Sequence, residues 1–444
     1  MKKKVFLVFL IGLLQVTVSF GEDLLQVYQQ ALENDPKFKQ LRANWQSQKM
    51  NLPIARAAYL PQFGVQANGT RNYTFLRPLT LSTIYGYNWS YGYTATLQQP
   101  LFALSAWQSI KQADAKVKAA TAGYLAAQQD LMARTTTAYF DALKRYNVLQ
   151  YTIARKEAIY KQMDSAKETY HAGLIAITDV YDAQSRYDVA RTQEIAARNA
   201  LEVSLEKLRA ITGHYYTHLL GLKKDVPLSV PEPKNIDTWT TAAEHENYNI
   251  QSQNYAVIAA MDNIKVIATQ DMPVISAAGS YAQAQNVASS GNRTTTDTAG
   301  LGLNLTYQPI QGGLINASVK QAKYDYVAAS GRLEEVDHQV VETTRSSFLN
   351  IVAGIGRIKS DKISIESAEK ALDAASVGLR VGTRTMIDVL ADLNNLYQNK
   401  QLYIEDQYDY LNNIIQLKNA SGRLSTIDMV RINKDLDSQI MLPK

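Results

Sequence analysis

The sequence predicts an α+β protein built as two internal repeats, in which pairs of long strands alternate with pairs of very long helices. Three observations support this class. The eleven prolines leave two intervals without proline, 101–226 and 310–442, and a proline inside a helix costs about 3 kcal/mol. Four segments alternate apolar and polar residues with a period of two, which is typical of strands. Several motifs also recur 209 positions apart, which indicates a duplication.

The segment 1–21 is predicted to be a signal peptide. Three lysines at positions 2–4 precede the apolar run Val5–Leu14, and small residues near Gly21 supply a cleavage site. We therefore expect an exported mature chain that begins at Glu22. The formal net charge is +5, and removing these three lysines leaves +2, which argues against a nucleic-acid partner. The chain has no cysteine, so disulfides and thiolate metal sites are excluded.

The two proline-free intervals are expected to be long helices. Their apolar residues recur at steps of three and four, as in Tyr139, Leu143 and Tyr146, which is the spacing of one helix face. The stretch from Ala103 to Tyr170 contains one glycine and would reach roughly 100 Å as a helix at about 1.5 Å per residue. Such a length indicates a coiled-coil rod and not a compact core.

The strands are expected as two pairs, over about 62–98 and about 274–308, with polar loops at 76–84 and 286–298. Long strands with one aromatic or apolar face are typical of outer-membrane β-barrels. The alternative is a soluble β-sandwich with one wet face, although strands there are usually about five or six residues long. Four strands cannot close a barrel, for which about eight is the minimum, whereas three chains would supply twelve.

The motif spacing predicts how the chain is divided. The first repeat is placed at 22–226 and the second at 237–424, joined by a proline-rich connector at 227–236 and followed by a C-terminal segment at 425–444. Each repeat is expected to run through a helix, a strand pair and two long helices joined by a glycine turn. Because the loops within the strand pairs are short, all the helices should leave the sheet on the opposite side.

The glycine turns, at about 171–180 and 380–389, are the most informative motif. The sequence AGLIAITDVY begins at Ala172, and VGTRTMIDVL begins at Val381. Gly173 and Asp179 precede Gly382 and Asp388 by the same 209 positions, but an arginine, Arg384, occurs in the second copy only. From the local sequence alone, Arg384 could simply cap a helix end, and the two aspartates could begin the next helices.

These turns, together with other motifs, resemble the TolC family of outer-membrane channel-tunnels, which serve tripartite efflux pumps and type I secretion systems. The motifs are LLQVYQQALENDP (24–36), YLPQFGV (59–65), KEAIYKQMDSA (156–166) and YQPIQGG (307–313). The resemblance covers essentially the whole mature chain. It implies a homotrimer with a twelve-stranded β-barrel in the outer membrane, which continues into a long periplasmic α-helical barrel. A band of short elements, including 425–444, would surround its equator.

The resemblance also implies roles for the turn residues. Arg384 would bond to Thr178 and Asp179 of a neighbouring hairpin and hold the tips closed until a pump opens them. Three copies of Asp388 would form an acidic ring at the pore constriction. Mutual repulsion raises the pKa of such carboxylates, so we expect cation selectivity to weaken at acid pH. The tips beside Gly173 and Gly382 would dock a periplasmic adaptor.

Two positions depart from the family pattern. The family has a second aspartate where this chain has Ala391, with Asp392 one residue later, and a tyrosine where this chain has Leu379. One helical residue turns by about 100°, so Asp392 is not expected to replace the missing aspartate. The closed entrance would then carry one acidic ring instead of two.

The predicted function is a passive, gated export duct for drugs or polypeptides in a Gram-negative outer membrane. Its predicted partners are outer-membrane lipid, a periplasmic adaptor and an inner-membrane transporter of the ABC, RND or MFS class. The alternative is a trimeric outer-membrane stalk or adhesin without export activity. We expect no catalysis and no cofactor. His214 and His218 have a spacing that can bind zinc on a helix, but they follow Gly213, where the helix is expected to end.

Overall fold

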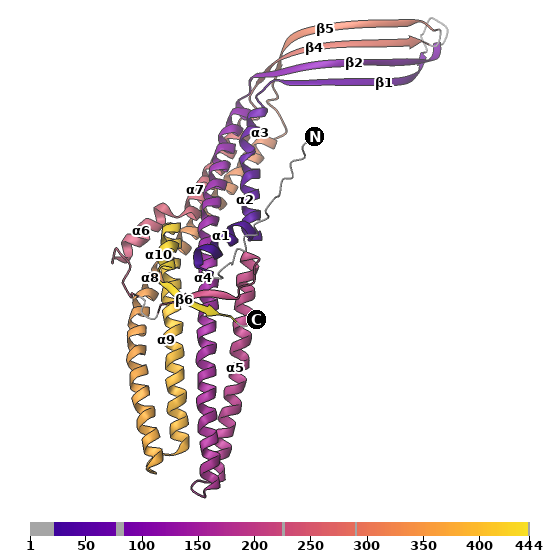
Figure 1. Cartoon of the computed structure of the whole chain (residues 1–444). Coiled ribbons are helices and arrows are strands. Elements are labelled where there is room, and N and C mark those ends of the chain that lie inside the picture. The colour runs from indigo at the N-terminus through magenta and orange to yellow at the C-terminus, as the bar shows by residue number, and fades with distance from the viewer. Residues whose placement is uncertain (1–21, 77–83, 224–226, 289–290, 443–444) are drawn as a thin grey trace, which may run out of the picture.

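The computed structural model describes residues 22–76, 84–223, 227–288 and 291–442, so the predicted signal peptide lies outside the described residues. Both halves of the chain contain short helices, then two long strands, then two long helices and a short strand, although the number of short helices differs (Figure 1). The first half contains α1 (Leu24–Asn34), α2 (Pro36–Lys49), α3 (Asn51–Ala57), β1 (Gln62–Leu76), β2 (Ile84–Phe102), α4 (Leu104–His171), α5 (Ile177–Thr212) and β3 (His218–Leu222). The second contains α6 (Ile236–Glu246), α7 (Tyr248–Ala268), β4 (Val274–Ala288), β5 (Arg293–Thr306), α8 (Leu314–Arg380), α9 (Met386–Ala420), α10 (Thr426–Asn433) and β6 (Leu436–Met441).

The four long strands form one antiparallel sheet at one end of the molecule, in the order β1-β2-β4-β5 (Figure 1). The sequence placed a polar loop over 286–298, and this prediction was wrong. Strand β4 continues to Ala288 and β5 begins at Arg293. The polar residues 293–298 are mostly threonines, which favour strands because they are β-branched, and the ladder with β4 satisfies their backbone groups.

The long helices form two antiparallel hairpins, α4 with α5 and α8 with α9, which extend away from the sheet (Figure 1). Helix α4 has 68 residues and α8 has 67. No proline interrupts either one, so each backbone N–H can bond to the carbonyl four residues earlier. Both hairpins turn at a glycine with positive φ, and the two turns lie at the end of the molecule opposite the sheet.

The main hydrophobic core lies midway along the hairpins, where the short elements surround α4 and α9. Its largest fully buried side chains include Tyr139, Phe140, Tyr408 and Tyr410. The resemblance implied short helices and strands around the equator without giving their bounds, and the structure shows β3 and β6 there, paired as a second, two-stranded antiparallel sheet. The Tyr139 hydroxyl donates a 2.6 Å hydrogen bond to the Leu220 carbonyl and thereby joins α4 to this sheet.

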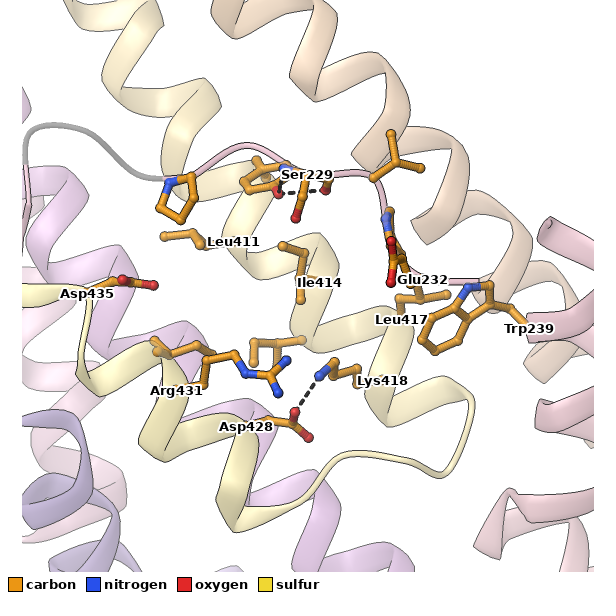
Figure 2. A pocket seen from close by; sticks show the side chains of 16 residues that line it. Ser229, Glu232, Trp239, Leu411, Ile414, Leu417, Lys418, Asp428, Arg431 and Asp435 are labelled. Carbon is orange, nitrogen blue, oxygen red and sulfur yellow. Dashed lines mark hydrogen bonds and ion pairs between the residues drawn. The ribbon is translucent and has the colours of Figure 1, made fainter. Parts of the chain in front are cut away.

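The proline-rich connector lies over α9 and beside α10 (Figure 2). The Tyr410 hydroxyl donates to the Ser229 carbonyl at 2.9 Å, and the Ser229 N–H donates back to the hydroxyl at 3.0 Å. Beneath the connector is a cavity of about 400 Å³, and at its edge Lys418 forms an ion pair with Asp428. The buried Tyr410 therefore fixes the connector to α9, and Trp239 Nε1 of α6 donates to the Pro233 carbonyl at 2.8 Å.

Among the residues that the structure describes, no helix is long and apolar enough to cross a membrane.

Candidate functional site

The first tip turn, residues 172–176, joins α4 to α5. Gly173 has φ +76°, which an L side chain rarely adopts. The Gly173 N–H donates to the Tyr170 carbonyl at 2.8 Å, and the Leu174 N–H donates to the Thr169 carbonyl at 3.0 Å. These bonds satisfy carbonyls at the end of α4. Helix α5 then begins without a side-chain cap, because Ala176 has no hydroxyl at the N-cap position.

The second tip turn, residues 381–385, joins α8 to α9 and repeats the glycine geometry, with Gly382 at φ +78°. Its N-cap differs, because Thr385 forms a capping box with Asp388. The Asp388 N–H donates to Thr385 Oγ1 at 3.2 Å, and the Thr385 N–H donates to Asp388 Oδ2 at 3.0 Å. The carboxylate of Asp388 is therefore held within its own chain.

This capping box changes the electrostatics of Asp388. The hydrogen bonds from Thr385 lower the pKa of Asp388 below its ordinary value, and the nearby charge of Arg384 lowers it further. Within one chain the shift is thus opposite to the rise expected from repulsion around an acidic ring. Sequence reasoning missed this cap, although the pattern Thr-x-x-Asp at 385–388 is the signal for a capping box.

Among the residues that the structure describes, Thr178, Asp179 and Arg384, which are predicted to close the entrance, lack the intrachain hydrogen bonds that hold Asp388. Thr178 and Arg384 are exposed and Asp179 is half-buried. Within the described part of the chain, no hydrogen bond or ion pair engages any of the three side chains. The Arg384 side chain instead packs against Gly378, where an added Cβ would lie 2.7 Å from Arg384 Cγ. These three polar side chains are therefore free to bond to another molecule.

The two tips share one small apolar cluster near the end of the hairpins. Met386 and Leu390 of α9 pack there with Met163 of α4 and Val180 of α5. Leu379, at the position where the family has a tyrosine, is partly buried against the same cluster. The structure thus brings both turns to one end of the molecule, but among the described residues of a single chain no ion pair or hydrogen bond joins Arg384 to Asp179.

The two histidines considered as zinc ligands are separated. His218 lies in β3 and contacts the Thr217 hydroxyl, whereas His214 precedes the strand and contacts Asn34. No group of three or more potential metal ligands occurs in the part of the chain that the structure describes.

Comparisons with known proteins give the family. The model of the family "Outer membrane efflux protein" matches residues 27–214 and 239–423. Outer membrane protein TolC of Escherichia coli is 34% identical over 436 residues, which are 96% of this chain and 87% of the relative. Alkaline protease secretion protein AprF of Pseudomonas aeruginosa is 24% identical over 420 residues, 93% of this chain and 86% of the relative.

A solved structure shows the same fold. The CmeC outer membrane channel of Campylobacter jejuni superposes with a TM-score of 0.79 at 18% identity, over 94% of this chain and 90% of that one. The predicted fold class, resemblance and location are confirmed: the chain has the trimeric channel fold, in the outer membrane with a periplasmic extension, and serves efflux or type I secretion. TolC-family proteins are channels that work with efflux or secretion systems and are not an enzyme family. The chain belongs to the outer membrane efflux protein family.

Proposed function

We propose that the trimer is a passive export duct whose periplasmic entrance is closed by bonds between the two kinds of tip turn on neighbouring chains. The observation that carries this proposal is the difference between two equivalent aspartates. Asp388 is bonded to Thr385 of its own turn, whereas the Asp179 carboxylate, three residues after Ala176, has no hydrogen bond or ion pair in the described part of its chain. Asp179 therefore remains available to a cation on another chain.

Arg384 is the cation that fits this role. It is exposed at the other tip turn and forms no ion pair within the described part of its own chain. Three chains of two hairpins would place six tips around the entrance, with the two kinds alternating. An arginine–carboxylate pair is directional because its two N–H groups can bond to both oxygens. We call the set Thr178, Asp179 and Arg384 the tip latch.

The expected strength of the tip latch suits a gate. An exposed ion pair contributes about 0–1 kcal/mol, so three pairs can bias the entrance toward closure while remaining easy to separate. The cluster of Met386, Leu390 and Val180 behind the tips holds the two hairpins of one chain together. Opening would then separate contacts between chains before it disrupts packing within them.

Asp388 is proposed to line the constriction that the latch closes. Its carboxylate is held in a fixed position by Thr385. Three such carboxylates around the axis would attract cations and repel anions. The family pattern has a second aspartate at the position of Ala391. The constriction of this protein would therefore carry one acidic ring and not two.

The turns themselves are proposed to dock a periplasmic adaptor. Gly173 and Gly382 are exposed, and nothing lies within 4 Å of where a Cβ would be, so backbone groups are accessible there. An inner-membrane transporter of the ABC, RND or MFS class would supply energy. The name of the Pseudomonas relative refers to protease secretion, which supports polypeptides as cargo beside drugs and bile-salt-like amphiphiles.

The first test is single-channel conductance of the purified trimer in a planar bilayer. The double variant Arg384→Ala with Asp179→Ala should conduct several-fold more than wild type, because the entrance is no longer held closed. The matched control is Arg380→Ala with Asp182→Ala, which removes the same two charges from exposed positions one turn away. This control should conduct like wild type.

A charge exchange separates a direct bond from a general effect of charge. Arg384→Asp alone should open the entrance, whereas Arg384→Asp combined with Asp179→Arg should restore the low conductance. If every variant conducts like wild type, the tip latch does not close the entrance, although the protein can still be an export duct. A folded trimer that never forms a channel would contradict export itself.

A further inference from the structure

Two arginines and an aromatic ring form one row across the four-stranded sheet, near its loop end. Arg71 of β1 lies opposite Trp89 of β2, Trp89 lies opposite Val287 of β4, and Val287 lies opposite Arg293 of β5. Residues that pair directly across antiparallel strands project to the same face of a sheet. Arg71 and Arg293 therefore share a face, and both are exposed.

That face is the more apolar of the two, with Gln285, Thr295 and Asp297 also on it near the loop end of β4 and β5. It carries exposed large side chains along all four strands, namely Phe63, Val65, Tyr73, Tyr87, Tyr91, Leu97, Tyr281, Leu301, Leu303 and Leu305. The other face carries small polar residues, such as Thr94 and Asn304. In a membrane barrel the apolar face contacts lipid. Both arginines thus lie on the lipid-facing surface of the sheet.

The position of Arg71 along β1 places it near the outer edge of the apolar band. Arg71 is nine residues beyond Gln62, which at about 3.3 Å per residue is roughly 30 Å along the strand. A strand tilt of about 40° reduces this to roughly 23 Å along the membrane normal, compared with an apolar band about 25 Å tall. The loop end faces away from the periplasmic helices (Figure 1), so Arg71 lies at the level of the outer headgroups.

The aromatic neighbours hold the Arg71 guanidinium in a fixed orientation. Its Cζ lies 4.5 Å from the centre of the Tyr87 ring and 5.7 Å from that of Trp89. The Tyr73 ring packs against the Tyr87 ring, with 5.0 Å between the two ring centres. A guanidinium stacked on a ring keeps its in-plane N–H groups available, and these match the oxygens of a phosphate.

The charges around this row also favour an anion. Among the described residues of the four strands, Arg71 and Arg293 are the basic residues and Asp297 is the acidic one. Asp297 lies four residues beyond Arg293 and accepts hydrogen bonds from Gln283 at 2.9 Å and Tyr281 at 3.3 Å. Strands β1 and β5 are the two edges of the sheet, so trimer closure brings the two arginine-bearing edges of neighbouring chains together.

We propose that Arg71 and Trp89 of one chain, together with Arg293 of the neighbouring chain, form a binding site for a lipid with an anionic phosphate headgroup in the outer leaflet. Within one chain the two arginines lie three strand spacings of about 4.8 Å apart, so the site lies where β1 of one chain meets β5 of the next. The acyl chains would lie along the apolar face below the row, and the phosphate would bond to the guanidinium groups. The site occurs three times around the trimer. This proposal does not depend on the tip latch.

The test measures lipid retention by the detergent-purified trimer, using native mass spectrometry. Wild-type protein should bind phosphatidylglycerol in preference to phosphatidylcholine. Because each arginine near a membrane surface adds substantially to the attraction, Arg71→Gln with Arg293→Gln should weaken phosphatidylglycerol binding by about tenfold or more. The control Arg332→Gln with Arg380→Gln removes two exposed arginines of α8 and should bind like wild type.

Other outcomes of this test would overturn the proposal. If wild type and the double variant Arg71→Gln with Arg293→Gln bind phosphatidylglycerol equally well, the two arginines do not form a lipid site. Complete displacement of the lipid by excess inorganic phosphate would identify a bare anion site and overturn the lipid assignment. If the double variant Arg71→Gln with Arg293→Gln does not form trimers, the double variant Arg71→Lys with Arg293→Lys is measured in its place. Lysine keeps the charge but lacks the planar fork, so a several-fold loss of binding supports the site, and no loss contradicts it.

Discussion

Thr385 and Ala176 occupy the same position in the two tip turns, and the hydroxyl that only Thr385 carries determines the environment of the aspartate three residues later. With the hydroxyl, Asp388 closes a capping box and its pKa is lowered. Without it, α5 begins uncapped and Asp179 keeps its carboxylate available. At the scale of single residues, one duplicated motif has thus acquired two different electrostatic roles.

Replacing this hydroxyl should change the pH at which cation selectivity is lost. The ring attracts cations only while Asp388 is ionised, and selectivity falls as the pH drops through its pKa. Thr385→Ala removes one of the bonds that lower this pKa, so selectivity should be lost at a higher pH than in wild type. Reversal potentials across a salt gradient, recorded between about pH 7 and pH 3, measure the midpoint, which is the pH at which half of the cation selectivity is lost.

Thr383→Ala is the matched control, because the Thr383 hydroxyl donates to the Gly378 carbonyl at 3.2 Å and takes no part in the capping box. It should leave the midpoint where it is in wild type. Asp388→Asn should abolish the pH dependence. A midpoint that is the same in Thr385→Ala and wild type would show that the cap does not control this charge.

At the scale of elements, the sheet depends on close contact between β2 and β4. Gly92 lies where these strands pair, and a Cβ added there would lie 2.2 Å from the Gln283 carbonyl oxygen. This oxygen belongs to the backbone, so it cannot move aside without disturbing the ladder. β2 and β4 come from different repeats, and Gly92 therefore contributes to joining the two halves in one sheet.

We expect Gly92→Ala to prevent correct pairing of β2 with β4 and to reduce the yield of membrane-inserted trimer strongly. The matched control is Gly302→Ala in β5, where nothing lies within 4 Å of the added Cβ. Heat-stable trimer on semi-native gels measures the effect. A normal yield of Gly92→Ala trimer would mean that the strands separate enough at this position to accept a methyl group.

At the scale of the whole molecule, two buried side chains hold the connector between the repeats, because Trp239 Nε1 also donates to the Pro233 carbonyl at 2.8 Å. Tyr410 is only 1% exposed, and its hydroxyl satisfies both the N–H and the carbonyl of Ser229. The second sheet adds another link, because β3 ends the first repeat and β6 ends the chain. The halves are therefore joined at the sheet, at the connector and at the equator.

Tyr410→Phe should loosen the connector, because the N–H and the carbonyl of Ser229 lose their bonds to the tyrosine hydroxyl, each of which contributes about 0.5–1.5 kcal/mol. Limited proteolysis should then cleave the segment 227–236 faster than in wild type. Tyr324→Phe is the control, since Tyr324 lies on α8 with 77% of its surface exposed and its hydroxyl makes no hydrogen bond within the described part of the chain. Equal cleavage rates in wild type and Tyr410→Phe would show that the apolar packing of the connector is sufficient by itself.

The sequence by itself determined the features that depend on local chemistry. Proline-free intervals specified the long helices, because proline is the residue that a helix interior excludes. Alternating residues specified the strands, and Gly173 and Gly382 marked the turns 209 positions apart. These signals, with the family resemblance, also indicated the tip residues Thr178, Asp179, Arg384 and Asp388, whose roles in the gate stay predictions.

The tertiary structure decided the features that depend on contacts between distant segments. The five-residue strand β3 is too short to be recognised by its period, and only its pairing with β6 makes it a strand. The end of the β4–β5 loop was set by the hydrogen-bond ladder and not by polarity. The row from Arg71 to Arg293 depends on the register of four strands, which cross-strand packing fixes and no local pattern encodes.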